Sequence, residues 1–143
     1  YAKCGYECRH NVGYWRRDDY LGFGIGAASK IGNRRFSNTV DIVEYQSNPG
    51  DSYVNIQELT KQDEVEETMF LGLRMVEGVS MELFQKIFGI SMEKVYGPVM
   101  DKHINHKLLQ IKEVDNQHYL CLTKKGMDVC NYVMSDFLEP VLF

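Results

Sequence analysis

The stretch from Asp19 to Ser29, DYLGFGIGAAS, decides how the rest of the chain is interpreted. Its first half is apolar and predicts a strand over Tyr20–Ile25, and a run of small residues follows. Gly and Ala carry little or no side-chain bulk, so a backbone or a flat ligand can approach them closely. On glycine chemistry alone, a ligand-approach site and a tight strand crossing inside a barrel explain the stretch equally well.

Length and charge limit the classes of protein to consider. The 143 residues suffice for one domain with a core, or for a small domain beside part of another. The net charge of −4 divides into +2 over residues 1–50 and −6 over residues 51–143. Because phosphate binding needs clustered Lys and Arg, the acidic second part predicts no nucleic-acid partner.

Targeting signals and cysteine usage predict a cytoplasmic protein. No apolar run approaches the roughly 20 residues that a membrane helix needs, so we expect no membrane span. We see no secretory leader, and the four Cys residues do not form a disulfide framework. The chain opens at Tyr1 rather than at Met, so we expect that its true N-terminus is missing.

A change of character near residues 47–52 predicts two parts. The Asn-Pro-Gly-Asp cluster at 48–51 indicates a linker between residues 1–50 and residues 53–143. The first part is expected to hold the strands Tyr20–Ile25 and Arg35–Thr39, the second after a turn at 31–33, and a short helix over 41–46.

The second part is predicted to be helical with one β-hairpin. Capping residues and apolar spacing predict helices from Thr60 to Gly78, from Ser80 to Gly89, from Ser91 up to a break at Gly97-Pro98, from Pro98 to about His106, and from Thr123 with the inner face Cys130, Val133, Met134 and Phe137. Alternation over 109–122 around Asp115-Asn116 predicts the hairpin. Helices, hairpin and helix form a winged-helix-like order, so the fold class is α+β.

Two groups of metal-ligand side chains are incomplete. Cys4 and Cys8 have the first spacing of an iron–sulfur motif, but Asn11 stands where a third Cys would be needed, and adding His10 gives half of a zinc set. His103 and His106 share a helix face, and His118 lies on the hairpin. Three imidazoles could bind a metal or haem iron, but we favour the interpretation that these histidines lie at a solvated helix end. For the cysteines we favour free thiols, so no metal site is predicted.

Other patterns give no complete catalytic apparatus. The Gly22-x-Gly24-x-Gly26 spacing departs from the dinucleotide fingerprint. The arginines at 16–17 and 34–35 suit carboxylates or phosphates, but scattered pairs favour a solvated surface.

Several segments together resemble one family. His10-Asn11-x-x-Tyr14-Trp15 and the stretch 19–27 resemble the end of the radical SAM domain of the HemN/HemW family, the oxygen-independent coproporphyrinogen III oxidases and their haem-chaperone relatives. The segments 70–74, 77–79 and 88–89, and Leu122-Thr123-x-x-Gly126 with Asn131, Val133, Phe137 and Leu138, resemble its C-terminal domain. The resemblance covers nearly the whole chain in one order.

The resemblance implies a C-terminal piece of about a third of a longer protein. Residues 1–50 would be the edge of an incomplete radical SAM barrel, and residues 53–143 a HemN-type C-terminal domain. The family's 4Fe-4S cluster motif is absent here, so the piece alone should be catalytically inert. In the whole protein, S-adenosylmethionine or substrate is expected near Gly24, Ile25, Gly26, Ala27 and Ile31.

The branch of the family decides the activity. The His-Asn-x-x-Tyr-Trp segment is more like the haem-chaperone branch, which binds haem and hands it on. The alternative is a coproporphyrinogen III oxidase, which converts propionates to vinyl groups, and a weaker one is a winged-helix regulator. Without the preceding strands, exposed strand edges are expected to promote self-association or partial disorder of residues 1–50.

One residue departs from the family pattern. Lys107 stands where the family usually has Gly before the hairpin. A Lys in the left-handed conformation costs about 1 kcal/mol relative to Gly. We therefore expect that the helix before the hairpin can end with a different backbone geometry from the family's.

Overall fold

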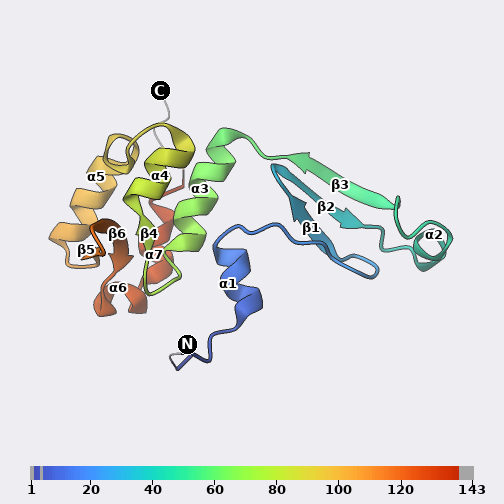
Figure 1. Ribbon diagram of the computed structural model, residues 1–143, viewed down its shortest axis with the longest axis horizontal. Coiled ribbons are helices and arrows are strands. Elements are labelled where there is room, and N and C mark those ends of the chain that lie inside the picture. Colours follow the sequence, from blue (N-terminus) through green and yellow to red (C-terminus); the bar gives the residue numbers. More distant parts are fainter. Residues whose placement is uncertain (1, 4, 139–143) are drawn as a thin grey trace. The chain divides into compact units, whose positions relative to one another are not determined.

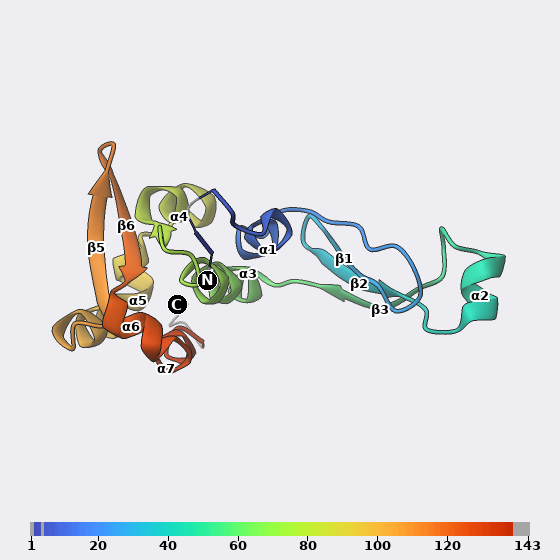
Figure 2. The ribbon, with the colours of Figure 1, turned by 90° about the horizontal axis from the view of Figure 1, so that it is seen from below.

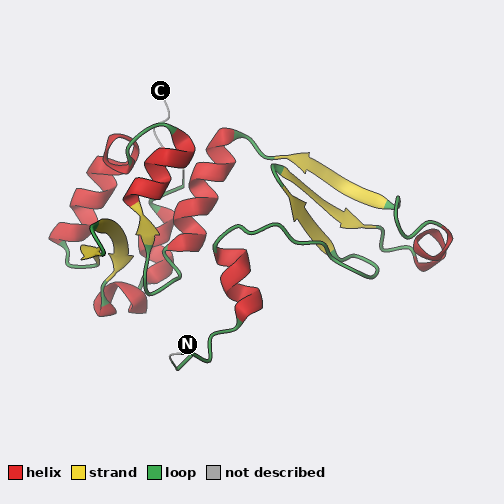
Figure 3. Cartoon of the chain, viewed as in Figure 1, coloured by secondary structure: helices red, strands yellow, loops and turns green. Residues whose placement is uncertain are grey.

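The computed structural model describes residues 2–3 and 5–138, whose contacts divide the chain into two units. The sheet unit is Asp18–Glu64, and the helical unit combines the residues up to Arg17 with those from Val65 onward (Figure 1). Helices and antiparallel sheets both occur, as the α+β class requires (Figure 3).

The sheet unit contains three antiparallel strands in the order β1-β2-β3: Ala28–Ile31, Arg34–Asn38 and Tyr53–Glu58. The predicted turn between the first two is confirmed, with Gly32 in the left-handed region at φ 59°. Between β2 and β3 lies the short helix α2 (Ile42–Ser47), whose first main-chain N–H groups donate to the Asp41 carboxylate. The predicted helix over 41–46 is therefore confirmed within one residue.

Strand β3 contradicts the predicted linker boundary. Residues 48–52 join α2 to β3 inside the sheet unit, because Val54 pairs with Ser37 and Tyr53 with Asn38. In β3, Val54 and Ile56 alternate with Asn55 and Gln57, a short period-two pattern that indicates a strand and that the linker interpretation overlooks. The assignment of residues 1–50 and 53–143 to parts of two family domains stays a prediction.

The strand predicted over Tyr20–Ile25 is wrong. Tyr20 alone forms a bridge, to Lys30, and residues 21–27 form a loop. Gly24 and Gly26 adopt φ values of 100° and 66°, which interrupt an extended backbone. The glycines are compatible with a strand crossing when only the sequence is considered. In the structure they instead prevent residues 21–27 from forming a strand.

The helical unit surrounds one apolar core. Its elements are α1 (Arg9–Trp15), α3 (Lys61–Gly72, which begins in the sheet unit), β4 (Val79–Ser80), α4 (Met81–Phe88), α5 (Met92–Asn105), β5 (Leu109–Val114), β6 (Gln117–Leu122), α6 (Lys124–Asp128) and α7 (Cys130–Ser135). The strand order is β4-β6-β5, and the predicted hairpin β5–β6 turns at Asp115 and Asn116 (Figure 2). Fully buried large side chains fill the centre, among them Met69, Phe84, Tyr96, Leu120, Met134 and Phe137.

Predicted helix starts are confirmed more often than predicted ends. Ser80, Ser91 and Thr123 each accept a main-chain N–H three residues on. The Thr60 hydroxyl likewise accepts the Asp63 N–H, while the Asp63 carboxylate accepts the Thr60 N–H. Short-range side-chain bonds of this kind are readable from sequence.

Three helix ends differ from the prediction. Helix α3 ends at Gly72, and Val76 is exposed rather than on its inner face. Helix α5 continues through Pro98, since one lost hydrogen bond is offset by the buried face that includes Tyr96 and Met100. The last helix is two helices, because the backbone leaves the helical range at Val129 (φ −122°, ψ 30°).

Lys107 retains the geometry that a glycine would favour. Its φ is 59°, its N–H donates to the Ile104 carbonyl, and its carbonyl accepts the Thr123 hydroxyl at 2.7 Å. The chain therefore ends α5 in the left-handed conformation despite the side chain.

We predict that Lys107→Gly raises the free energy of unfolding by up to about 1 kcal/mol, because glycine removes the left-handed penalty. Urea unfolding followed by circular dichroism measures it. Lys107→Ala is the matched control and should give no gain, since it keeps the Cβ atom. Equal stabilisation by both variants would show that the conformation is not the cause.

Candidate functional site

The residues Leu21–Ala27, here called the glycine loop, are held by hydrogen bonds from the sheet unit. The Asn38 side-chain amide donates to the carbonyls of Gly22, at 3.2 Å, and Gly24, at 2.8 Å. The Asn38 main-chain N–H donates to the Ala27 carbonyl at 2.9 Å. Asn38 is 3% exposed, so these bonds form away from water, where their loss is costly.

Donors of the loop itself are also satisfied. The Gly22 N–H donates to the Ser29 hydroxyl and the Gly24 N–H to the Tyr45 hydroxyl, both at 3.0 Å. The Gly26 N–H donates to the Thr39 carbonyl at 3.0 Å. The Thr39 hydroxyl in turn donates to Glu44 on α2. The loop is therefore a fixed backbone arrangement and not a flexible connection.

Glycine is required at these positions for two different reasons. A Cβ atom on Gly22 would collide with the Ala28 carbonyl oxygen. Gly24 and Gly26 need positive φ, and the direction a Cβ would take from Gly24 meets no atom within 4 Å. The first glycine permits close backbone packing, and Gly24 leaves open space beside the backbone.

The structure brings together four of the five predicted ligand-approach residues. Gly24 and Ala27 are half-buried in the loop, and Ile25 and Gly26 are exposed beside them. Ile31 lies three residues along β1 from Ala28, a distance of roughly 10 Å at strand geometry. Ile31 therefore does not line the glycine loop.

Apolar side chains around the loop are exposed. Phe23 is 84% exposed and Val40 78%, and half of Ile25 is accessible. The Cγ1 atom of Val40 lies 3.5 Å from the position that a Cβ on Gly26 would take. Exposed apolar side chains thus lie close to the accessible main chain of the glycine loop.

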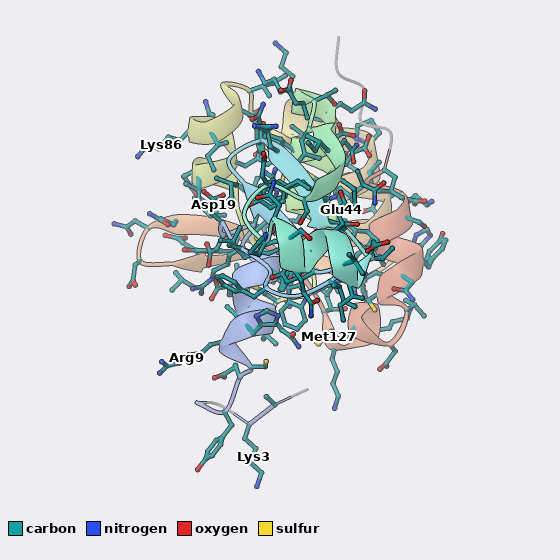
Figure 4. All side chains as sticks on the ribbon, turned by 90° about the vertical axis from the view of Figure 1, so that its right-hand side faces the viewer. Lys3, Arg9, Asp19, Glu44, Lys86 and Met127 are labelled. Carbon is teal, nitrogen blue, oxygen red and sulfur yellow. The ribbon has the colours of Figure 1, made fainter. Side chains whose placement is uncertain are left out.

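Asp19 fastens the strand next to the loop. Its Oδ1 accepts the Gly32 N–H at 2.9 Å and the Lys30 Nζ at 3.3 Å, which together lower the pKa of Asp19. Asp19 and Glu44 are both labelled in Figure 4. Nothing in the local sequence pattern indicates this contact.

The three histidines of the helical unit do not gather into one site. His103 is fully buried, and its Nε2 lies 2.9 Å from Asp136 Oδ2. His118 is exposed and its Nδ1 lies 2.8 Å from Glu82 Oε1. His106 lies exposed at the C-cap of α5. Within the described ranges, no group of three His, Cys, Asp or Glu side chains could hold a metal ion.

His103 corrects the expectation of a solvated helix end. Asp136, the residue directly after α7, contacts both His103 and Lys102. The hydrogen bond from the Lys102 ammonium is the largest cause of the lowered pKa of the Asp136 carboxyl, and the contact with His103 lowers it further. His103 Nδ1 has no partner among the described residues. His103 therefore belongs to the packing of α5 against α7.

Helix α1 carries a fourth histidine on a fixed support. His10 is exposed, with its ring edge-on to Tyr14 at a centroid distance of 4.8 Å. Beyond the end of α1, Arg17 binds Glu67 and Thr68 on α3, each at 3.3 Å, and Arg16 binds Glu77. The Arg17 side chain is 13% exposed, so the expected solvated surface is wrong for this residue.

The cysteine pair near the N-terminus is only partly described. Cys8 is an exposed free thiol, and Cys4 lies outside the described residues. The structure also contains, over its described residues, no helix long and apolar enough to cross a membrane.

Comparison with known proteins decides the family. The family model described as HemN C-terminal domain matches residues 59–129. The haem chaperone HemW of Lactococcus lactis is 36% identical over 94% of this chain, and that of Bacillus subtilis is 33% identical over 96%. The chain belongs to the HemN/HemW family.

The matched HemN/HemW relatives are longer. The chain spans about a third of their length, 35% of the L. lactis protein and 36% of the B. subtilis protein. The solved structure titled coproporphyrinogen III oxidase (HemN) from Escherichia coli, a radical SAM enzyme, matches with a TM-score of 0.63 at 17% identity, covering 85% of this chain and 29% of that one. This likeness shows a shared fold, and the predicted family is confirmed.

We predict that Asn38→Ala lowers the free energy of unfolding of the sheet unit by about 1–3 kcal/mol, because it leaves the carbonyls of Gly22 and Gly24 without their donor. Asn38→Asp should cost more, since a buried carboxylate would face two carbonyl oxygens. Urea unfolding measures both variants.

The matched control is Asn33→Ala in the exposed β1–β2 turn, which should change stability by less than about 0.5 kcal/mol. Equal effects at positions 38 and 33 would contradict the anchoring role of Asn38.

Proposed function

We propose that the chain is the C-terminal part of a haem chaperone of the HemN/HemW family. The supporting observation is that relatives called HemW match nearly its whole length, including that of Haemophilus influenzae at 30% identity over 96% of the chain. The His10-Asn11-x-x-Tyr14-Trp15 segment, which resembles the chaperone branch, points the same way.

We further propose His10 as the ligand of the haem iron. An axial ligand needs an available imidazole nitrogen beside apolar or aromatic surface. The ring of His10 is exposed and contacts Tyr14, and neither ring nitrogen is hydrogen-bonded to a described residue. His103 is buried, and one nitrogen of His118 is taken by Glu82. His10 lies on the segment by which the branch is recognised.

The glycine loop is proposed to approach S-adenosylmethionine or substrate in the whole protein. The open space beside Gly24 and the small residues at 26 and 27 fit a flat ligand against the main chain. Ile31 would reach the same ligand only if the ligand extended along β1. The cofactor would supply radical chemistry together with a 4Fe-4S cluster whose ligands lie outside this chain, so the piece alone is proposed to be catalytically inert.

The remaining proposals concern context. The sheet unit would continue the radical SAM barrel, the second part would form a winged-helix-like domain, and the protein would work in the cytoplasm. If the whole protein were instead an oxidase, its cluster-loaded form would convert coproporphyrinogen III to protoporphyrinogen IX. A winged-helix regulator would bind DNA at physiological salt, which the acidic second part disfavours.

We predict that the chain binds one haem and that His10→Ala weakens binding at least about tenfold, because the iron loses its ligand. Titration followed by haem absorbance measures it. His106→Ala is the matched control, an exposed histidine on another helix, and should leave binding unchanged. Absence of binding by the unaltered chain, or loss in the His106 variant alone, would overturn the proposal.

Self-association through strand edges is a separate proposal. Among the described residues, strand β3 pairs on one side only, with β2, and Ile56 on it is 54% exposed. Sedimentation should show concentration-dependent dimers that Ile56→Lys reduces, since a charge on an edge strand opposes pairing. Val43→Lys, on α2, is the control. A monomer at all concentrations would contradict edge pairing.

A further inference from the structure

A hollow of about 260 Å³ lies in the helical unit where α4 packs against β6. Its lining comes from four elements: Met81, Glu82 and Gln85 of α4, Glu93 of α5, Ile111 of β5 and His118 of β6. The haem proposal does not use these residues. The chemistry of the lining therefore indicates what the hollow can take.

The lining combines apolar side chains with carboxylates. Met81 is 9% exposed and Ile111 46% exposed, so Ile111 in particular offers accessible surface for an aliphatic stem. Glu82 and Glu93 are both exposed members of the lining. This combination suits a side chain with a long apolar stem and a cationic end.

Glu82 is held in place by the hairpin. Its carboxylate accepts the main-chain N–H of His118, at 3.0 and 2.9 Å, and faces the ring Nδ1 at 2.8 Å. The contact raises the pKa of His118 and lowers the pKa of Glu82. Glu82 and His118 are thus fixed by each other, which leaves Glu93 as the lining carboxylate that can meet an incoming cation.

The charge of the hollow stays negative in both states of His118. Glu82 and Glu93 contribute two negative charges, His118 contributes at most one positive charge, and Glu113 on β5 adds to the negative potential at His118. Lys86, one turn after Glu82, extends into solvent and is not part of the lining (Figure 4). The helical unit as a whole has no net charge, with +3 over residues 1–17 and −3 over residues 65–143, so the attraction for a cationic group is local to these carboxylates.

We propose that this hollow receives an arginine side chain from the surface of a partner protein. The guanidinium would pair with the Glu93 carboxylate, since its planar fork matches a carboxylate in two-point contact. The three methylenes would lie over Met81 and Ile111. The proposal concerns a surface apart from His10 and stands or falls independently of haem binding.

The test uses N-acetyl-arginine amide as the probe and follows the methyl signals of Met81 and Ile111 by NMR. The signals should shift saturably with the arginine probe and not with N-acetyl-citrulline amide, which has the same shape without the charge. Glu93→Gln should weaken the apparent affinity about fivefold, the worth of one exposed ion pair.

Glu113→Gln is the matched control, because it removes the same charge from a residue outside the lining. It should weaken binding by much less than Glu93→Gln. Equal shifts with arginine and citrulline, equal effects of the two variants, or shifts that never saturate would each overturn the proposal. Unchanged spectra of the variants without probe show that the fold is intact.

Discussion

The side chain of Asn38 is the contact on which the sheet unit depends. One buried amide binds the carbonyls of Gly22 and Gly24, and the main chain of the same residue binds Ala27. Asn38, the last residue of β2, therefore holds the glycine loop against the end of that strand. Because this closure uses residues of the chain alone, the glycine loop has its shape before any cofactor or further domain is added.

Local signals predict the helical unit well. Side-chain caps such as Ser80 and Thr123 act over three residues, and the hairpin turns at two residues with positive φ, so a sequence window contains the cause of each. The end of α3 and the break between α6 and α7 are harder to predict, because the core and not the local pattern decides where a helix stops. Strand β3 has only a short apolar alternation, at Val54 and Ile56, and its pairing with β2 over a long stretch of chain decides that it belongs to the sheet.

The ligand role of residues 24–27 stays a prediction. The small size of these contiguous residues is visible in the sequence, whereas the residues that hold the loop, Asn38 and Tyr45, are distant in sequence and unremarkable in type. His103 lies in α5 and His106 at its C-cap, close to the predicted placement, but it is the contact with Asp136, thirty-three residues after His103, that ties His103 to the packing of α5 against α7. Pairing over long sequence distances carries this information, and no spacing rule contains it.

The most direct test of this account is amide hydrogen exchange of the glycine loop in the 143-residue chain, measured by NMR without added ligand. If Asn38 and its neighbours shape the loop, the N–H groups of Gly22, Gly24 and Gly26 exchange more slowly than the exposed amide of Phe23, since each has an acceptor. Exchange of all four at the rate of an unstructured peptide would contradict a loop formed by this chain alone.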